Sequence, residues 1–262
     1  MSVKIIEVVD ALERCAPLPL EESYDNAGLQ IGLTEAEVSG ALLCLDVTES
    51  VIDDAIRKGC NMIVSHHPLI FRKLAHITGQ TYVERCVAKA IKNDIAIVAM
   101  HTNLDAVEGG VNHQIAERLG LEDVRFFGRQ QTVDERNGGN GVVGNLPSPL
   151  EPREFIQKVK NIFHVKCMQT NQLLDYPIRS VAVCGGAGSF LIDEAISEGA
   201  DAFITGEVGY HEFFGREQMI QVLALGHYQS EQYTTEVLRR VIEPLGVRCE
   251  ISEINTNPIL YI

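Results

Sequence analysis

The stretch Asn61-Met62-Ile63-Val64-Ser65-His66-His67-Pro68 sets two adjacent histidines directly after a short apolar run. An apolar run of this length, bounded by turn residues, predicts a buried strand. Open α/β sheets carry their chemistry beyond the carboxyl ends of the strands, so His66 and His67 fall where a site is expected. A single His pair can equally consist of solvated loop residues or helix caps. Its assignment as a ligand pair therefore needs further signals.

The first further signal is a second copy of the pattern. The stretch from Ile52 to Gly59 matches the stretch from Ile192 to Gly199, and the same spacing separates Cys44 from Cys184. Each copy predicts a strand, a helix, a glycine cap and a second strand. When the alignment of the two copies is extended with the same spacing, Glu207 aligns with His67. A histidine and a glutamate, both common metal ligands, thus occupy matching positions in the two copies.

The duplication continues as an apolar strand followed by His-x-x-x-acid. It occurs as His101-Thr102-Asn103-Leu104-Asp105 and again as His227-Tyr228-Gln229-Ser230-Glu231. Residues four apart lie on one face of a helix, which suits joint coordination of a metal ion. The alternative is an acid that only complements a helix dipole, beside a core or capping His. The pattern occurs twice, and in each copy an earlier strand ends in His67 or Glu207. We therefore favour metal ligation.

The predicted fold is α/β, with two pseudo-symmetric halves from an internal duplication and the metal site between them at the carboxyl ends of strands. The halves are residues 1–124 and 179–262, joined by a connecting segment, 125–178, with partial structure of its own. Within that segment, Asn137-Gly138-Gly139-Asn140-Gly141 predicts a hairpin or mobile turn.

Two polar stretches are weaker candidates. A glycine-rich turn after the strand that ends at Cys184 exposes backbone N–H groups that could hold a phosphate or carboxylate, and its candidate substrate residues are Gly185, Gly186, Gly188 and Ser189. It lacks a P-loop lysine and the full G-x-G-x-x-G spacing, and a tight strand-to-helix turn explains it at least as well. Asp25 and Asn26 could support a site, although an Asx-turn accounts for them better.

Composition narrows the class of protein. The 262 residues carry a net charge of −14, which argues against binding nucleic acid through a basic surface. No apolar run approaches the roughly 20 residues of a membrane span, and the N-terminus has no signal-peptide pattern. The seven cysteines form no C-x-x-C motif, so buried reduced thiols are expected. These features predict a cytoplasmic protein.

Over essentially its whole length the chain resembles the dinuclear metal-centre proteins labelled GTP cyclohydrolase 1 type 2 homologues, an Ngg-interacting-factor-like family. The resemblance is carried by Asp25-Asn26-Ala27-Gly28-Leu29-Gln30-Ile31-Gly32, Ser65-His66-His67-Pro68-Leu69-Ile70-Phe71, His101-Thr102-Asn103-Leu104-Asp105, Thr205-Gly206-Glu207 and Gly226-His227-Tyr228-Gln229-Ser230-Glu231. One departure is Tyr24, where the family often has Trp, which affects packing more than ligation.

The resemblance implies a hexameric ring of two-domain subunits with two divalent metal ions in each. The implied metal ligands are His66, His67, Asp105, His227 and Glu231. The family pattern does not usually count His101 or Glu207 among the ligands, so these two residues are candidates for proton transfer or for support of the ligands.

Five mixed nitrogen and oxygen ligands on two ions leave open positions, as catalytic sites do, and they suit Zn, Mn, Fe or Ni. We therefore expect a metal-dependent hydrolase that acts on a small phosphate-bearing or nucleotide-like molecule through a metal-bound water. A GTP ring-opening activity is the specific form that the family label implies. The alternative is a non-catalytic metal-binding ring that serves protein partners as a scaffold or regulator.

Overall fold

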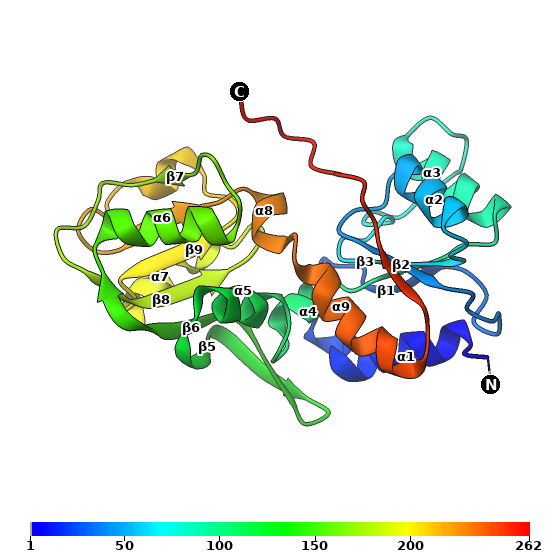
Figure 1. Ribbon diagram of the computed structural model, residues 1–262, viewed down its shortest axis with the longest axis horizontal. Coiled ribbons are helices and arrows are strands. Elements are labelled where there is room, and N and C mark those ends of the chain that lie inside the picture. Colours follow the sequence, from blue (N-terminus) through cyan, green and yellow to red (C-terminus); the bar gives the residue numbers. More distant parts are fainter. Residues whose placement is uncertain (1) are drawn as a thin grey trace. The chain divides into compact units, whose positions relative to one another are not determined.

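The computed structural model describes residues 2–262, which form two compact units (Figure 1). Among the described residues, unit 1 comprises residues 2–104 and 234–260, and unit 2 comprises residues 105–233 with the last two residues. Each unit contains one β-sheet and several helices. The predicted α/β class is therefore confirmed. Among the described residues, no helix has both the length and the apolar character that a membrane span needs.

The sheet of unit 1 has five strands in the order β1-β4-β3-β2-β11. Strands β4, β3, β2 and β11 run parallel, whereas β1 pairs antiparallel with β4 at one edge. Strands β2, β3 and β4 consist mostly of apolar residues and are fully buried, as expected for parallel strands whose sheet is covered on both faces. The strand bounds are β1 Gly28–Ile31, β2 Ala41–Cys44, β3 Met62–Ser65, β4 Ala96–Ala99 and β11 Cys249–Ile251.

Four helices cover this sheet. Helices α2 (Glu49–Arg57) and α3 (Tyr82–Lys92) pack together against a core that includes Leu42, Ile63 and Ile97. Helices α1 (Ile5–Cys15) and α9 (Thr234–Ile242) contact each other, and α9 also contacts β2. In Figure 1, α2 and α3 lie on one side of the strands of this unit and α1 and α9 on the other.

The sheet of unit 2 has six strands in the order β5-β6-β8-β9-β10-β7. Strands β8, β9 and β10 run parallel, and the other pairings are antiparallel. The strand bounds are β5 Glu122–Val133, β6 Arg136–Leu150, β7 Gln169–Thr170, β8 Ile178–Cys184, β9 Ala202–Thr205 and β10 Gln221–Ala224. The longer helices of this unit are α5 Val111–Leu119, α6 Pro152–Ile162 and α7 Ile192–Ser197.

Two short helices follow the last parallel strand of each copy, α4 (Thr102–Ala106) after β4 and α8 (His227–Glu231) after β10. Single turns of 3₁₀ helix complete the described structure. They are η1 Leu18–Leu20, η2 Ser189–Leu191, η3 Tyr210–Phe213 and η4 Glu243–Leu245.

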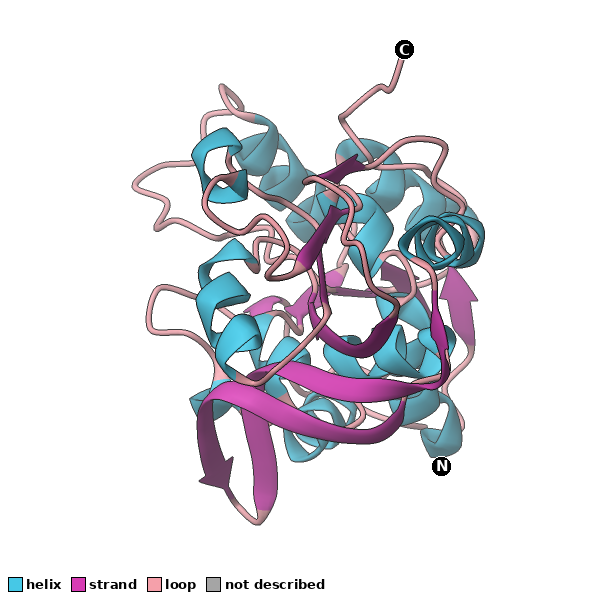
Figure 2. Cartoon of the chain, turned by 90° about the vertical axis from the view of Figure 1, so that its left-hand side faces the viewer, coloured by secondary structure: helices cyan, strands magenta, loops and turns pink. Residues whose placement is uncertain are grey.

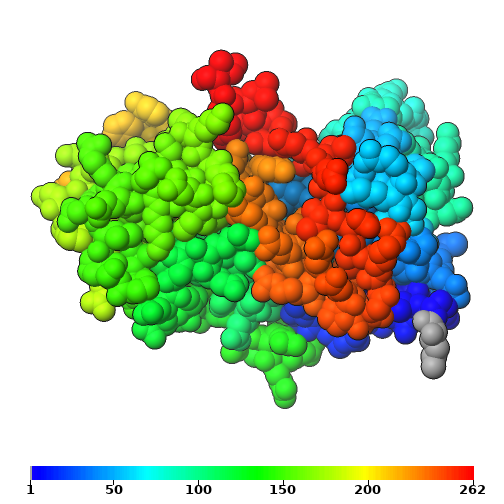
Figure 3. All heavy atoms as spheres, in the orientation of Figure 1, coloured from blue at the N-terminus to red at the C-terminus, as the bar shows by residue number. Residues whose placement is uncertain are grey.

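The hairpin of unit 2 turns at a different place from the one predicted. Its tip is Asp134-Glu135, whose φ angles are both positive at 47° and 64°, whereas residues 137–141 lie inside β6. Figure 2 shows the two long strands meeting at a narrow tip, and the tip projects from the surface in Figure 3. The expected turn at 137–141 is therefore wrong. Those glycines serve close packing, since a Cβ at Gly141 would lie 2.5 Å from Cε1 of Phe127.

The duplication is visible in strand register. Cys44 lies opposite Ser65 in the parallel pair β2–β3, and Cys184 lies opposite Thr205 in the pair β8–β9. The helix after each copy belongs to the other compact unit: α5 packs on β6 and β8, and α9 packs on β2. The sequence halves 1–124 and 179–262 describe copies rather than compact units, and this division stays a prediction.

Candidate metal-binding site

His66 and His67 stand on backbone that still belongs to the sheet of unit 1. The His66 N–H donates to the Cys44 carbonyl at 3.2 Å and the His67 N–H donates to the Leu45 carbonyl at 2.9 Å. The Ser65 hydroxyl donates to the His67 carbonyl at 2.8 Å, and His66 is completely buried. These bonds extend the strand pairing past the end of β3. The two imidazoles are therefore mounted on rigid backbone.

His66, His67 and His101 each have a hydrogen-bond acceptor at Nδ1. The Met100 carbonyl lies 2.8 Å from Nδ1 of His66, and the nearest carboxylate oxygens of Asp46 and Asp25 lie 2.7 Å from Nδ1 of His67 and His101, respectively. A carbonyl only accepts, so Nδ1 of His66 carries the proton, and the carboxylates favour the same tautomer in the other two rings. Nε2 is thereby left as the ligand nitrogen. Metal-binding histidines are commonly oriented in this way, by a hydrogen bond from the other ring nitrogen to a protein acceptor.

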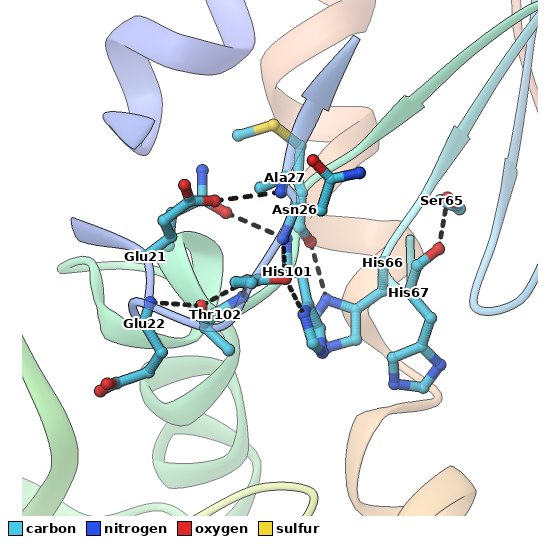
Figure 4. Close-up of polar contacts among 12 residues, drawn as sticks. Glu21, Glu22, Asn26, Ala27, Ser65, His66, His67, His101 and Thr102 are labelled. Carbon is cyan, nitrogen blue, oxygen red and sulfur yellow. Dashed lines mark hydrogen bonds and ion pairs between the residues drawn. The ribbon is translucent and has the colours of Figure 1, made fainter. Parts of the chain in front are cut away.

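The three imidazoles form a group that could hold a metal ion. Their ring centroids are separated by 4.9 Å (His66 to His67), 5.3 Å (His66 to His101) and 5.5 Å (His67 to His101). One nitrogen from each ring lies within 4.8 Å of the others. Figure 4 shows the three rings gathered beyond the end of β3. Nitrogen donors of this kind suit Zn, Fe, Ni and Cu far better than Ca or Mg.

Asp25 is a buried carboxylate committed to this group. Its side chain accepts hydrogen bonds from His101 Nδ1, from the Thr102 hydroxyl and from two backbone N–H groups, those of Asn26 at 2.7 Å and Thr102 at 3.0 Å. Burial raises the pKa of Asp25, but the bonds from His101, Thr102 and Asn26 outweigh burial and lower the pKa to about 2. Asp25 therefore stays ionised near neutral pH and fixes the ring of His101.

Asp46 plays the matching part for His67. Burial raises the pKa of Asp46, yet the hydrogen bonds from His67 and the Thr256 hydroxyl hold it below its ordinary value. The sequence analysis missed Asp46. The available signal was its place two residues after the strand end at Cys44, at the same edge of the sheet as His66 and His67.

Asn26 and Gln30 fasten the loop that follows the His pair. Nδ2 of Asn26 donates to the Ile70 carbonyl at 2.5 Å, and the Ile70 N–H donates to Oε1 of Gln30 at 2.8 Å. Gln30 in turn donates to the Asn26 carbonyl at 2.7 Å. The stretch from Asp25 to Gln30 thus holds His101 through its acid and the loop after His67 through its amides.

Unit 2 carries a second group of candidate ligands on and beside α8. Nδ1 of His227 lies 3.0 Å from Oε1 of Glu207, and Nε2 of His227 lies 3.2 Å from Oε2 of Glu231. The Glu231 side chain is 3% exposed and that of Glu207 is 56% exposed. The spacing of four residues puts His227 and Glu231 on one face of the helix, as the sequence predicts.

The glycine-rich turn packs directly beneath these side chains. Gly186 has φ +58°, and a Cβ there would lie 2.3 Å from Oε1 of Glu231. The Gly186 carbonyl accepts the N–H groups of Gly206 and Glu207 at 2.9 Å and 3.0 Å. Gly186 therefore positions both Glu207 and Glu231 through its backbone and its lack of a side chain.

The backbone N–H groups of this turn are bound within the protein. Gly185 donates to Oδ1 of Asn112 at 2.8 Å, Gly186 to the Ser230 hydroxyl at 3.0 Å and Gly188 to the Thr205 hydroxyl at 3.0 Å. Ser189 begins η2. The glycines hold the turn in place, and a role in substrate binding for these four residues stays a prediction.

Asp105 opens unit 2, within α4. Its carbonyl accepts a hydrogen bond from Nδ2 of Asn112 at 3.1 Å, and the same amide also reaches the Asn140 carbonyl at 3.2 Å. Since Oδ1 of Asn112 binds the Gly185 N–H, this 1%-exposed residue ties Asp105 to the glycine-rich turn. Sequence analysis did not single out Asn112, because an amide on a helix face has no local signal of such a role.

Comparisons with known proteins show which family the chain is similar to. The family model described as Duf34/NIF3 (NGG1p interacting factor 3) matches residues 3–258. A Clostridium acetobutylicum protein named GTP cyclohydrolase 1 type 2 homolog is 34% identical over the whole of both chains.

Solved structures of similar fold also cover the full chain. A Staphylococcus aureus hypothetical protein superposes with a TM-score of 0.91 at 29% identity, covering 100% of both chains. A Bacillus cereus protein related to NIF3 gives a TM-score of 0.90 at 25% identity, covering 100% of this chain and 99% of that one. Together with the match to the family model, these likenesses show that the chain belongs to the Duf34/NIF3 family.

Proposed function

We propose that this protein is a dinuclear metal-dependent hydrolase of small phosphate-bearing or nucleotide-like molecules. The observation that carries the proposal is the group of three imidazoles in unit 1, each held at Nδ1 and each offering a nitrogen within 4.8 Å of the others. Such supported imidazoles are typical of metal sites. The proposed ligands are His66, His67, Asp105, His227 and Glu231.

Along the chain, the candidate ligands Asp105 and Glu231 lie close to the two connections between the units. The chain passes from unit 1 to unit 2 between Leu104 and Asp105, and returns between Tyr233 and Thr234. Asp105 is thus covalently joined to the last residue of the first segment of unit 1, and Glu231 lies within three residues of the second passage.

The residues of the site have different roles in the proposed hydrolysis. When bound, two divalent ions supply Lewis acidity toward a phosphate group and toward water. The Asp25 carboxylate at Nδ1 stabilises the imidazolium that forms when His101 accepts a proton at Nε2. Glu207 is well exposed and can receive or release a proton to solvent, while it orients His227 through Nδ1. In a further arrangement His101 itself ligates a metal with His66 and His67.

The donor set suits Zn, Mn, Fe or Ni, with two ions per subunit. The printed name of the clostridial relative suggests GTP ring opening as the specific reaction. We also propose that the chain assembles as a hexameric ring in the cytoplasm. The second candidate is a non-catalytic metal-binding scaffold for protein partners, which the family description as an interacting factor favours.

Elemental analysis of purified, metal-reconstituted protein tests the proposal, with His66→Ala and Glu231→Ala as variants. His211→Ala is the matched control, since this exposed histidine lies outside the groups described. We expect about two metal ions per chain in the wild type and in the control, and loss of metal in both variants. No bound metal in reconstituted wild type would refute the proposal.

A metal-dependent phosphatase and nucleotide hydrolysis screen on the same samples separates the two candidate functions. Asp105→Asn should abolish turnover while the oligomer survives. Metal without any turnover, combined with a partner interaction that persists in Asp105→Asn, would favour the scaffold.

A further inference from the structure

A groove in unit 1 begins where the His pair ends. Its volume is ≈ 610 Å³, and its lining runs from Pro68, directly after His67, to Glu84 at the start of α3. The ring of Phe71 lines it and also meets the ring of His101 edge to face, with centroids 6.1 Å apart. Phe71 therefore contacts the imidazole group of unit 1 and lines the groove as well.

Hydrogen bonds fix both ends of the segment that forms the groove. At one end, Asn26 and Gln30 bind the backbone of Ile70. At the other, the buried Glu84 carboxylate accepts the N–H groups of Thr78 and Gln80 at 2.8 Å and 3.2 Å. A groove held at both ends is formed before any ligand arrives, which reduces the entropic cost of binding.

The lining is suited to a flat apolar group. Pro68, Leu69, Leu74 and Val83 supply aliphatic surface, while the aromatic rings of Phe71 and Tyr82 are 43% and 55% exposed. The ring of Tyr24, itself 63% exposed, meets Phe71 edge to face at 6.4 Å. Exposed aromatic rings in a groove offer stacking and edge contacts to a planar ligand.

Two cations in the lining point to the charge of the ligand. Arg72 and Lys73 are exposed, and they make no hydrogen bond or ion pair with any residue from 2 to 262. A guanidinium and an ammonium in the same lining suit a phosphate group.

We propose that this groove binds the aromatic part of an anionic ligand, a planar ring that bears a phosphate group. The ring packs against Phe71 and the aliphatic lining, and Arg72 and Lys73 bind the phosphate. This inference rests on the proposed function, and it assigns the substrate class of that site as aromatic phosphates rather than phosphates in general.

Binding of 1-naphthyl phosphate to the metal-loaded protein tests the assignment, with inorganic phosphate as the reference ligand. The chain contains no Trp, so the naphthyl fluorescence is observed without interference. We expect the aromatic phosphate to bind about tenfold more tightly than inorganic phosphate, the size of one good aromatic contact. Phe71→Ala should remove this difference and leave the affinity for inorganic phosphate and the metal content unchanged.

A second variant and two controls complete the experiment. Arg72→Gln with Lys73→Gln should weaken 1-naphthyl phosphate about tenfold and reduce the dependence of its affinity on salt. Phe190→Ala and the pair Lys92→Gln with Arg153→Gln remove an exposed aromatic ring and two exposed cations outside the groove, and should change nothing. Equal affinity for the two ligands in the wild type, or unchanged aromatic preference in Phe71→Ala, would overturn the assignment.

The outcomes also separate this inference from the proposed function. Metal-dependent turnover of phosphates without any aromatic preference would support the proposed hydrolase activity and reject the groove as the feature that selects its substrate. Tight binding that depends on Phe71, without turnover of any phosphate, would keep the groove as a binding site and reject the hydrolase.

Discussion

Replacing Asp25 by Asn should destabilise unit 1 and loosen its imidazole group. The aspartate side chain is completely buried and accepts four hydrogen bonds, two at each oxygen. An asparagine has only one oxygen to offer. Whichever way the amide turns, its NH₂ faces a backbone N–H, of Asn26 in one orientation and of Thr102 in the other. Neither of these donors can accept, so one backbone N–H loses its partner.

The expected loss can be worked out from the pKa. Burial opposes ionisation of Asp25, but its hydrogen bonds bring the pKa from 3.8 to about 2. At about 1.4 kcal/mol per pKa unit, the folded state gains about 2 kcal/mol from the ionised form at neutral pH. This stabilisation is fully present above the ordinary pKa and is lost as the pH falls toward the folded-state value. Removing the charge and leaving an N–H unsatisfied should cost about 2–3 kcal/mol at pH 7.

Urea unfolding of the metal-free protein, followed by circular dichroism, measures this cost. The control is Asp10→Asn, an exposed aspartate on α1. The difference between wild type and Asp25→Asn should shrink as the pH is lowered from about 4 to about 2, because protonation removes the same charge in the wild type. We also expect metal binding to weaken about 10–100-fold, as for other lost partners of metal-site histidines. A stability and a metal affinity equal to those of the control would refute the reasoning.

Three further predictions follow from the geometry. Gly186→Ala should lower both stability and metal content, because the added Cβ displaces Glu231. Gly199→Ala is the control: its φ is also positive (+76°), but nothing lies within 4 Å of the added Cβ, so it should show only the conformational cost. Equal effects of the two variants in melting and metal assays would contradict this prediction. Hydrogen bonds from neighbouring backbone and hydroxyl groups lower the pKa of Glu84 to about 2, so wild type should lose stability relative to Glu84→Gln as the pH falls from about 4.5 to about 2, which thermal melts across that range would detect. Metal at about 100 times its Kd should stabilise the wild type by about 2.7 kcal/mol, and calorimetry should show no such gain for His66→Ala.

The sequence was sufficient to predict the strands that carry the site. Buried parallel strands appear as short apolar runs. The spacing of the two copies predicts that His67 and Glu207 follow matching strand ends, and the strands β3 and β9 do end at Ser65 and Thr205. His101 was also placed correctly beyond β4, and the structure groups it with His66 and His67.

Other features were beyond the sequence because they depend on distant contacts. Asp46 meets His67 and Asp25 meets His101 only once the sheet has formed, since 21 and 76 residues separate them along the chain. Gly141 was taken for a turn residue, because glycine marks both turns and close packing, and only the ring of Phe127 opposite it distinguishes the two.

The exchange of helices between the units determines how the molecule can fold during synthesis. Apart from its last two residues, unit 2 is one continuous segment, so its sheet can be completed while the ribosome is still adding residues. Unit 1 must wait, because β11 and α9, which cover an edge of β2 and part of a sheet face, are made last. Until then the nascent chain exposes apolar surface beside the His pair. We therefore expect chaperones to bind mainly to the first hundred residues, both in the nascent chain and in prematurely terminated products. Folding of unit 1 is complete only once the C-terminal segment has been made.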